Sequence, residues 1–214
     1  MDKKNLYKLR KEFSVEVLTE DNIKSNPYEQ FDQWFSDALK LDSMEANTMF
    51  LATSSTASIP SLRTVLLKEF DKNGFVFFTN YSSRKGKEIS ENPNIALLFY
   101  WKELERQILI EGVAEKVSSE ESVIYFNSRP FDSRISAAVS EQSKIIENRE
   151  LLESKFSELK KKYIDQNIPK PEHWGGYRLI PVRFEFWQGR ENRLHDRIQY
   201  SKDKDIWNIN RLSP

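Results

Sequence analysis

The sequence predicts an α+β fold in which a largely antiparallel sheet or barrel is flanked by helices. Three observations support this class: short runs of β-branched and aromatic residues, helical patterns that interrupt these runs, and no strict alternation of one strand with one helix. With 14 Phe, 8 Tyr and 5 Trp in 214 residues, the chain carries enough bulky side chains to form a core. We expect an N-terminal arm over residues 1–26, mobile unless it docks, and one compact domain over residues 27–214.

Five segments are predicted to be helices. Each shows apolar residues three and four positions apart, a capping residue at its start, or a proline near its end. They are residues 26–41, 83–91, 118–129, a segment from residue 132, and residues 148–166.

Eight runs have the composition of strands, and the sequence DKNG between two of them is typical of a hairpin turn. Gly112 lies inside one run and indicates a bulge. The runs are residues 48–54, 62–70, 75–80, 94–101, 106–117, 176–189, 193–200 and 205–212.

Charge and composition exclude several functional classes. Lys+Arg and Asp+Glu are both 33, so no net field would gather nucleic acid or an acidic membrane surface. The chain has no Cys, and His173 and His195 are its only imidazoles, which leaves no disulfide and no thiolate or multi-histidine metal centre. Motifs of a Rossmann loop, a P-loop and a nucleophilic hydrolase are missing. Because the longest apolar run, Ile95–Trp101, is far too short for a membrane span and the N-terminal residues lack the apolar core of a signal peptide, we expect a cytoplasmic protein.

The segment from Arg193 to Arg197 is the most informative candidate site. In an extended strand, Arg193, His195 and Arg197 would share one face and would repel one another unless an anion met them. The alternative is a solvated strand face that is balanced by Asp196 and Glu191. Both interpretations stay open at this point.

Two cationic pairs lie earlier in the chain. Arg63 and Lys68 differ by an odd number of positions, so a regular strand would point them to opposite faces. They would serve one site only through a bulge, a strand end or two ligand positions. Arg84 and Lys85 lie at an expected helix start, where backbone N–H groups and the helix dipole favour a phosphate. Ordinary strand-end charges and a common polar helix start are the alternatives.

A third candidate group flanks the expected helix break at Pro130. Tyr125, Arg129 and Ser133 are spaced by four and would converge on a phosphate through charge-assisted and hydroxyl hydrogen bonds, although surface positions are the more common outcome. Trp187 stands on the polar face of its strand, where it would stack on an aromatic ligand or lie at a rim or subunit contact.

Taken together, these residues resemble the pyridoxine (pyridoxamine) 5′-phosphate oxidase family over about Leu9 to Pro214. Ordered matches over most of the chain are much more specific than any single cluster. The motifs are RTVLLK from Arg63, FFTNYSSRKGKEI from Phe77, LERQILIEG from Leu104, YFNSRP from Tyr125, ESKFSEL from Glu153, HWGGYR from His173, EFWQGRENRLHDR from Glu185 and the terminal NRLSP.

The resemblance implies an FMN-binding split barrel that works as a homodimer, with flavin sites at the interface that both subunits build. The FMN contacts that it implies are Arg63, Thr64, Val65, Leu66, Leu67, Lys68, Phe78, Thr79, Arg84, Lys85, Gln107, Gln142, Ser143, Trp187 and Arg197. The substrate contacts that it implies are Arg10, Lys68, Tyr125, Arg129, Ser133, Arg193 and His195, with Arg193 and His195 as the catalytic pair that faces the pyridine ring.

The implied reaction oxidises pyridoxine 5′-phosphate and pyridoxamine 5′-phosphate to pyridoxal 5′-phosphate. A hydride would pass from substrate C4′ to N5 of FMN, and O2 would reoxidise the flavin to give H2O2, with NH3 released from the amine. The chain departs from the family pattern at Phe13, where a Tyr is expected in an N-terminal lid, at Phe131 and at Ser136-Ala137-Ala138. A flavin or pyridoxal phosphate carrier, another flavin enzyme of the same barrel and a nucleic-acid-binding barrel are the alternative interpretations.

Overall fold

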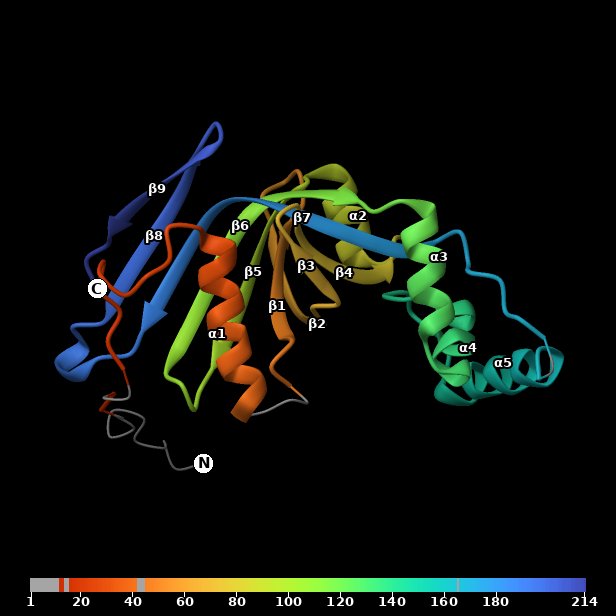
Figure 1. Ribbon diagram of the computed structural model, residues 1–214. Helices are drawn as coiled ribbons and strands as arrows, with labels where there is room; N and C mark the ends of the chain where they lie inside the picture. The colour runs from red at the N-terminus through yellow and green to blue at the C-terminus, as the bar shows by residue number, and fades with distance from the viewer. Residues whose placement is uncertain (1–11, 14–15, 42–44, 165) are drawn as a thin grey trace, which may run out of the picture. The chain divides into compact units, whose positions relative to one another are not determined.

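The computed structural model describes residues 12–13, 16–41, 45–164 and 166–214 of the chain (Figure 1). The helices in these ranges are α1 (Pro27–Leu41), α2 (Arg84–Glu91), α3 (Ser119–Ser128), α4 (Phe131–Val139) and α5 (Arg149–Lys162). The strands are β1 (Thr48–Ser54), β2 (Pro60–Leu66), β3 (Glu69–Asp71), β4 (Gly74–Asn80), β5 (Asn94–Trp101), β6 (Arg106–Lys116), β7 (Trp174–Gln188), β8 (Asp196–Asp203) and β9 (Ile206–Arg211). Within the described ranges, no helix is both long and apolar enough to cross a membrane.

The chain divides into two compact units. Unit 1 consists of Met1–Met49, Leu97–Ile110 and Val182–Pro214, and unit 2 consists of Phe50–Ala96 and Glu111–Pro181. Four strands, β1, β5, β6 and β7, run from one unit into the other. The division into an arm and a single domain that the sequence suggests stays a prediction.

The strands form one sheet in the order β2-β1-β5-β6-β7-β4-β3, and β8 pairs with β7 and β9. The pairings β3–β4, β4–β7, β7–β8 and β8–β9 are antiparallel. In the hairpin between β3 and β4, Asp71 is the partner of Gly74, and Gly74 has a φ of 134°, a conformation that side chains disfavour. The hairpin predicted from the DKNG sequence is therefore confirmed.

The run over residues 62–70 forms two strands instead of the single one that we expected. β2 ends at Leu66, β3 begins at Glu69, and between them the N–H of Lys68 donates to the carbonyl of Val76 at 2.9 Å. Inside β6, a Cβ on Gly112 would lie 2.1 Å from the carbonyl oxygen of Ile180. This close backbone approach explains why glycine occupies the strand, and the bulge stays a prediction.

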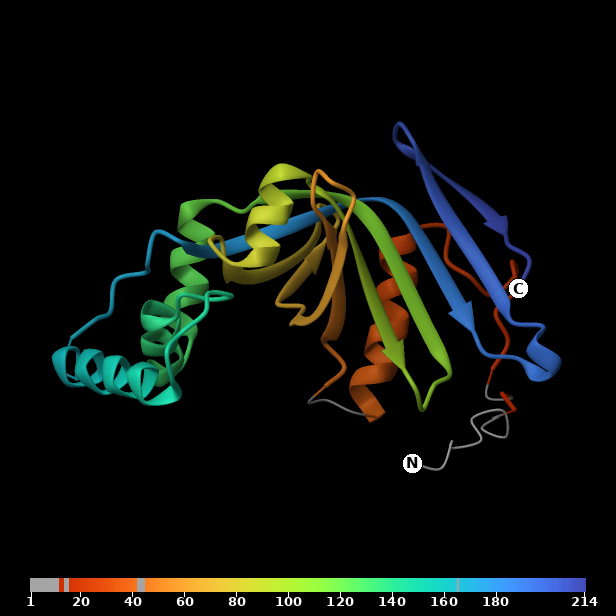
Figure 2. The same cartoon turned by 180° about the vertical axis from the view of Figure 1, so that it is seen from behind.

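In unit 1, helix α1 packs its apolar face on the sheet. The rings of Trp34 and Phe186 meet edge-on with 5.3 Å between centroids, and Phe31 meets Phe99 in a similar way at 5.1 Å. Phe31, Phe99 and Phe186 are fully buried, so the apolar spacing along α1 places the core face as predicted. Figures 1 and 2 show α1 along one face of β5 and β6.

In unit 2, helices α3, α4 and α5 form a second core. Its buried members are Phe126, Ile135, Ile168 and Trp174. The predicted capping box starts α3, because the Ser118 side chain accepts from the third residue of the helix, whose own side chain accepts from the Ser118 backbone N–H. This cap fixes where α3 begins.

The segment around His195 differs from the extended strand that we expected. Arg193 has a positive φ of 62° and lies in a 3₁₀ turn, so β8 begins only at Asp196. The backbone N–H of Arg190 donates to Nδ1 of His195 at 3.1 Å across this turn. Arg193, His195 and Arg197 therefore do not share one face of a strand, and that prediction is wrong.

The described part of the N-terminal arm is bound to the C-terminal strands of unit 1. The backbone N–H of Leu18 donates to the carboxylate of Asp196 at 3.1 Å, and the hydroxyl of Tyr200 donates to the carbonyl of Lys24 at 2.7 Å. Leu18 is buried. Residues 18–24 are thus held by both an apolar contact and backbone hydrogen bonds.

Candidate functional site

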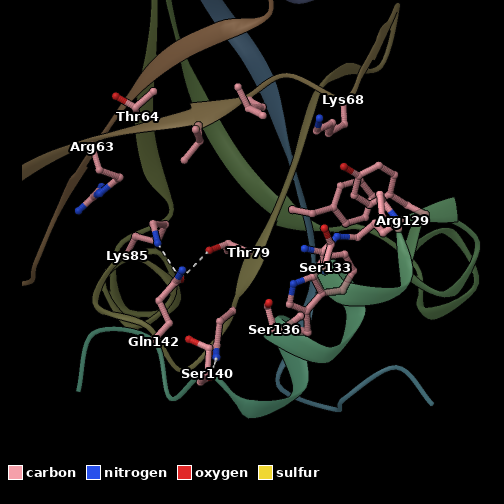
Figure 3. Close-up of a pocket in the computed structure, with 18 residues that line it drawn as sticks. Arg63, Thr64, Lys68, Thr79, Lys85, Arg129, Ser133, Ser136, Ser140 and Gln142 are labelled. Carbon is pink, nitrogen blue, oxygen red and sulfur yellow. Dashed lines mark hydrogen bonds between the residues drawn. The ribbon is translucent and has the colours of Figure 1, made fainter. Parts of the chain in front are cut away.

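A cavity of about 800 Å³ lies within unit 2, a volume in the range of about 300–1,000 Å³ that is typical of small-molecule sites. Four cationic side chains line it, Arg63, Lys68, Lys85 and Arg129, and the described lining residues include no carboxylate. Arg63 and Lys85 stand on one side of the cavity, and Lys68 and Arg129 stand on the other (Figure 3). The other lining residues are Thr64, Val65, Leu66, Phe78, Thr79, Asn80, Tyr125, Pro130, Ser133, Ser136, Ala137, Ser140, Gln142 and Trp174.

Arg63, on β2, is held by a dense set of hydrogen bonds. Its Nη1 donates to the carbonyl of Leu51 at 3.2 Å and to the Thr53 hydroxyl, and its Nη2 donates to the Ser61 hydroxyl and to Glu88 at 3.1 Å. Burial lowers the pKa of the Arg63 guanidinium, and the Glu88 carboxylate opposes this effect. The Arg63 side chain therefore has one well-defined position at the edge of the cavity.

Glu88, on α2, is a buried carboxylate behind this side of the cavity. Burial alone would raise its pKa, but hydrogen bonds from two hydroxyls and from the guanidinium groups of Arg84 and Arg63 outweigh burial and lower the pKa to about 2. Arg84 contributes its Nε, at 2.8 Å from Glu88 Oε1. Glu88 is thus the anionic centre on which two arginines converge.

Lys85, at the start of α2, points into the cavity toward Gln142. Its Nζ lies 3.0 Å from Gln142 Oε1, which also accepts from the Thr79 hydroxyl at 3.3 Å. These bonds are the dashed lines in Figure 3. Burial, and after it the charge of Arg63, lowers the pKa of Lys85. The two cations repel each other, so an anion between them would be stabilised.

The other side of the cavity is formed where α3 ends and α4 begins. Arg129 caps the C-terminal end of α3, directly after Ser128, and its buried Nη1 has no hydrogen-bond partner among the described residues. Burial lowers the pKa of Arg129, while its guanidinium stacks 4.9 Å above the Trp174 ring. A buried guanidinium N–H without an acceptor is costly, and an anionic ligand would supply the missing acceptor.

Lys68 lies beyond the end of β2, and this position allows it to line the same cavity as Arg63 although the two differ by an odd number of positions. β2 ends at Leu66, so Lys68 is free of the strand alternation, and both cations line the cavity. The Lys68 ammonium lies 6.0 Å from the centre of the Tyr125 ring. The strand end that we considered from the sequence is therefore the observed solution.

Three stacked aromatic rings form the apolar wall beside these cations. The rings of Phe78 and Tyr125 are 4.0 Å apart, and that of Trp174 stacks 5.5 Å from Phe78. This wall is rigid because Trp174 belongs to the buried core of α3 and α4.

A second cluster of predicted residues lies in unit 1. The Trp187 and His195 rings are 4.7 Å apart, and Phe13 meets His195 edge-on at 5.6 Å. Since Nδ1 of His195 accepts from a backbone N–H, its neutral form carries the proton on Nε2. Arg197 Nε donates to the buried Glu185 carboxylate at 2.8 Å, so its guanidinium is fixed as well.

The structure brings most of the predicted site residues together in the cavity and leaves others elsewhere. Those that line it are Arg63, Thr64, Val65, Leu66, Lys68, Phe78, Thr79, Lys85, Tyr125, Arg129, Ser133 and Gln142. Leu67 is buried, Arg84 and Ser143 are exposed, and none of the three is in its lining. Gln107, Trp187, Arg193, His195 and Arg197 belong to unit 1, and Arg10 lies outside the described residues.

Sequence reasoning did not include among the site residues Glu88, which lies behind the cavity, or six of the residues that line it, Asn80, Pro130, Ser136, Ala137, Ser140 and Trp174. Trp174 supplies part of the aromatic wall, and Glu88 supplies the buried carboxylate. The spacing of Arg84 and Glu88, four residues apart on an expected helix, was a usable signal for an ion pair. The burial of Glu88 had no signal, because the segment from Arg84 to Glu91 is polar apart from Gly86 and Ile89.

Comparison with known proteins identifies the relationships of the chain. Residues 35–163 match the family model described as pyridoxamine 5′-phosphate oxidase, and residues 174–214 match the pyridoxine 5′-phosphate oxidase C-terminal dimerisation region. A pyridoxine/pyridoxamine 5′-phosphate oxidase of Trichormus variabilis is 55% identical over 207 residues, covering 96% of this chain and 97% of that protein. One of Burkholderia thailandensis is 54% identical over 209 residues, with 96% and 97% covered.

Solved structures support the same relationship. PhzG of Burkholderia lata 383, solved in complex with tetrahydrophenazine-1-carboxylic acid, has a TM-score of 0.88 and 31% identity, and the match covers 94% of this chain and 100% of that one. A pyridoxamine 5′-phosphate oxidase-related, FMN-binding protein of Nostoc punctiforme has a TM-score of 0.70 at 17% identity, covering 86% and 97%, and so supports the fold alone. The expected α+β split-barrel class is confirmed, and the chain belongs to the pyridoxamine 5′-phosphate oxidase family.

Proposed function

We propose that this protein is an FMN-dependent oxidase that converts pyridoxine 5′-phosphate and pyridoxamine 5′-phosphate into pyridoxal 5′-phosphate, with O2 as the electron acceptor. The relatives that carry the name of this oxidase match nearly the whole chain. The observation that carries the proposal is that one cavity has cations on two sides and no carboxylate among its described lining residues. Two phosphorylated ligands, a cofactor and a substrate, need two such groups of cations.

The residues present fit FMN on one side of the cavity. Arg63 and Lys85 would bind its phosphate together with Arg84, and the backbone of β2 from Thr64 to Leu66 would line the ring system. Thr79 and Gln142 offer a hydroxyl and an amide in the middle of the cavity. Polar groups at such fixed points would orient the cofactor.

The substrate phosphate would bind on the other side. Lys68 and Arg129 supply charge, and the hydroxyls of Tyr125 and Ser133 supply two further hydrogen bonds. The unpartnered Nη1 of Arg129 is the group that gains most from such a ligand. Binding energy from this remote phosphate would be used to align the reacting carbon.

When bound, FMN supplies a two-electron acceptor at N5 for the hydride of substrate C4′, and O2 takes up the electrons as H2O2. The alcohol substrate gives the aldehyde directly, while the amine gives an imine that water hydrolyses with loss of NH3. Arg193 and His195 would face the pyridine ring, with Nε2 of His195 as a hydrogen-bond donor. Trp187 and Arg197 would contact the flavin.

We further propose a homodimer with FMN at the subunit interface. The support is the match of residues 174–214 to a C-terminal dimerisation region. This segment holds Trp187, Arg193, His195 and Arg197, so the proposed dimer and the ring-facing residues depend on the same part of the chain.

An anaerobic visible spectrum of the purified, FMN-reconstituted protein tests the proposal. Addition of pyridoxine 5′-phosphate should bleach the flavin band, and readmission of air should restore it with formation of pyridoxal 5′-phosphate and H2O2. A flavin band that ignores both phosphorylated substrates would overturn the proposed reaction in favour of a carrier or a different oxidoreductase. Failure to bind FMN after reconstitution would also overturn the proposal that FMN is the cofactor.

A further inference from the structure

We propose that Glu88 is a positioning residue for the cofactor phosphate: its buried carboxylate holds Arg63 and Arg84 in the orientation in which they bind that group together with Lys85. The inference rests on the proposed function, since it concerns the FMN side of the cavity. Glu88 does not line the cavity itself. It acts through the two arginines.

The hydrogen bonds of Glu88 show how it acts. Its side chain is only 7% exposed. Oε2 accepts from Arg63 and from the hydroxyls of Thr53 and Ser61, while Oε1 accepts from Arg84. Both oxygens are therefore occupied, each by a different arginine, and the carboxylate links β2 to α2.

A count of donors shows which N–H groups remain for a ligand. The four bonds made by Nη1 and Nη2 of Arg63 use its terminal N–H groups, which leaves its Nε and its positive charge. Arg84 is bonded the other way round: Nε is used on Glu88, and its terminal nitrogens have no partner among the described residues. Glu88 thus leaves the planar fork of Arg84 available for bidentate binding of a phosphate.

The charge of this group also matches a phosphate monoester. Arg63, Arg84 and Lys85 carry three positive charges and Glu88 carries one negative charge, which leaves a net charge of two. A phosphate monoester carries about −1.5 to −2 at neutral pH. Without Glu88, two neighbouring guanidinium groups would repel each other and would lose their common anchor.

The position of Glu88 is set by the close packing of α2 against the loop that precedes it. A Cβ on Gly86 would lie 2.2 Å from the carbonyl oxygen of Tyr81, so the glycine lets the helix approach the preceding loop. Ser83 caps the helix by accepting from the N–H of Gly86. One turn after Arg84, the side chain of Glu88 then points into the protein.

A comparison of FMN with riboflavin, which has the same rings and ribityl chain without phosphate, tests the proposal. We would measure Kd for both flavins by fluorescence quenching, with the full chain freed of flavin, for wild type, Glu88→Gln and the control Glu91→Gln. Glu91 lies on the same helix, is exposed, and loses the same charge. Thermal unfolding of each variant is recorded in parallel.

We expect Glu88→Gln to raise the Kd of FMN by at least about tenfold, which corresponds to about 1.4 kcal/mol, while the Kd of riboflavin changes by less than about twofold. Glu91→Gln should leave both unchanged. Equal weakening of both flavins would show a merely structural role and overturn the proposal, as would unchanged or tighter FMN binding. If Glu88→Gln does not fold, Glu88→Asp, which keeps the charge on a shorter chain, should show the same loss of preference for FMN.

The result also separates this inference from the proposed function. A wild-type protein that binds FMN but oxidises neither substrate overturns the reaction, while the two Kd values still decide the role of Glu88. A wild-type protein that binds riboflavin as tightly as FMN overturns the role of Glu88 directly, whatever it oxidises.

Discussion

The cavity of unit 2 and the His195 cluster of unit 1 differ in how their positive charges are balanced by carboxylates. In the cavity, four cations line one space without a carboxylate among the described lining residues. Near His195, two arginines have carboxylate partners: Arg197 lies 2.8 Å from Glu185, and Arg211 lies 2.8 Å from Asp196. Three of the four cavity cations, all except Arg63, thus have no carboxylate partner among the described residues, whereas Arg197 and Arg211 are already paired.

This difference suggests that the cavity cations serve mainly to bind ligands, whereas the His195 cluster serves mainly to orient the reacting groups. Unneutralised cations in a cavity gain free energy when an anion enters, so substitutions there should change affinity. The surroundings of His195 contain paired arginines and a ring that is held by a backbone hydrogen bond. These groups gain little charge stabilisation from a ligand but hold their geometry, so substitutions there should change turnover. Three predictions test this separation.

The largest effect is expected in unit 1. Arg193→Ala and His195→Ala should each lower kcat by about 10²- to 10³-fold, the loss that is typical when a preorganised polar group is removed from a reacting centre. FMN content should stay close to that of wild type, because neither residue lines the cavity. Steady-state kinetics together with the flavin absorbance per protein measure both quantities.

Lys204→Ala is the matched control, because Lys204 is an exposed cation of unit 1 between β8 and β9. It should change neither kcat nor FMN content. Full activity in both site variants would remove Arg193 and His195 from the reaction, and a parallel loss of FMN would mean that they act in binding.

A smaller effect is expected in unit 2. Arg129→Ala should raise KM for pyridoxine 5′-phosphate by roughly 30- to 100-fold with less change in kcat, because charge-assisted hydrogen bonds contribute about 1.5–3 kcal/mol. Arg149→Ala removes an exposed arginine of α5 that does not line this cavity, and it should leave KM unchanged. An unchanged KM in Arg129→Ala would exclude Arg129 from the phosphate site.

The sequence was informative wherever one local interaction decides the structure. The capping box at Ser118, the DKNG hairpin and the apolar spacing of α1 were all predicted correctly, because each signal acts within a few residues. The convergence of Tyr125, Arg129 and Ser133 on one cavity was one of the two alternatives that their spacing left open, the other being surface positions. Their spacing follows directly from two helices that meet at Pro130.

The sequence was not informative where contacts between residues far apart in the chain determine the local structure. The period of two suggested a strand through Arg193, but its positive φ and the bond from Arg190 to His195 start β8 only at Asp196. The burial of Glu88 likewise depends on Thr53 and other residues of neighbouring strands. Such contacts have no signature in local spacing.

The smallest effect is expected in the pH dependence of stability. It concerns two carboxylates, Glu88 in unit 2 and Glu20 in unit 1, whose pKa values are both lowered to about 2. A lowered pKa contributes stability above the unfolded value, 4.5, and this contribution is lost as pH falls toward 2. For buried Glu88, the free energy of unfolding should fall by about 2 kcal/mol between about pH 5 and pH 3, and Glu88→Gln should lack this part of the slope. Glu20 owes its low pKa chiefly to the hydrogen bond from Arg211, but it is exposed and screened by solvent, so Glu20→Gln should keep the wild-type slope. Urea unfolding across this pH range measures both slopes, and equal slopes in the two variants would mean that burial does not distinguish the two carboxylates.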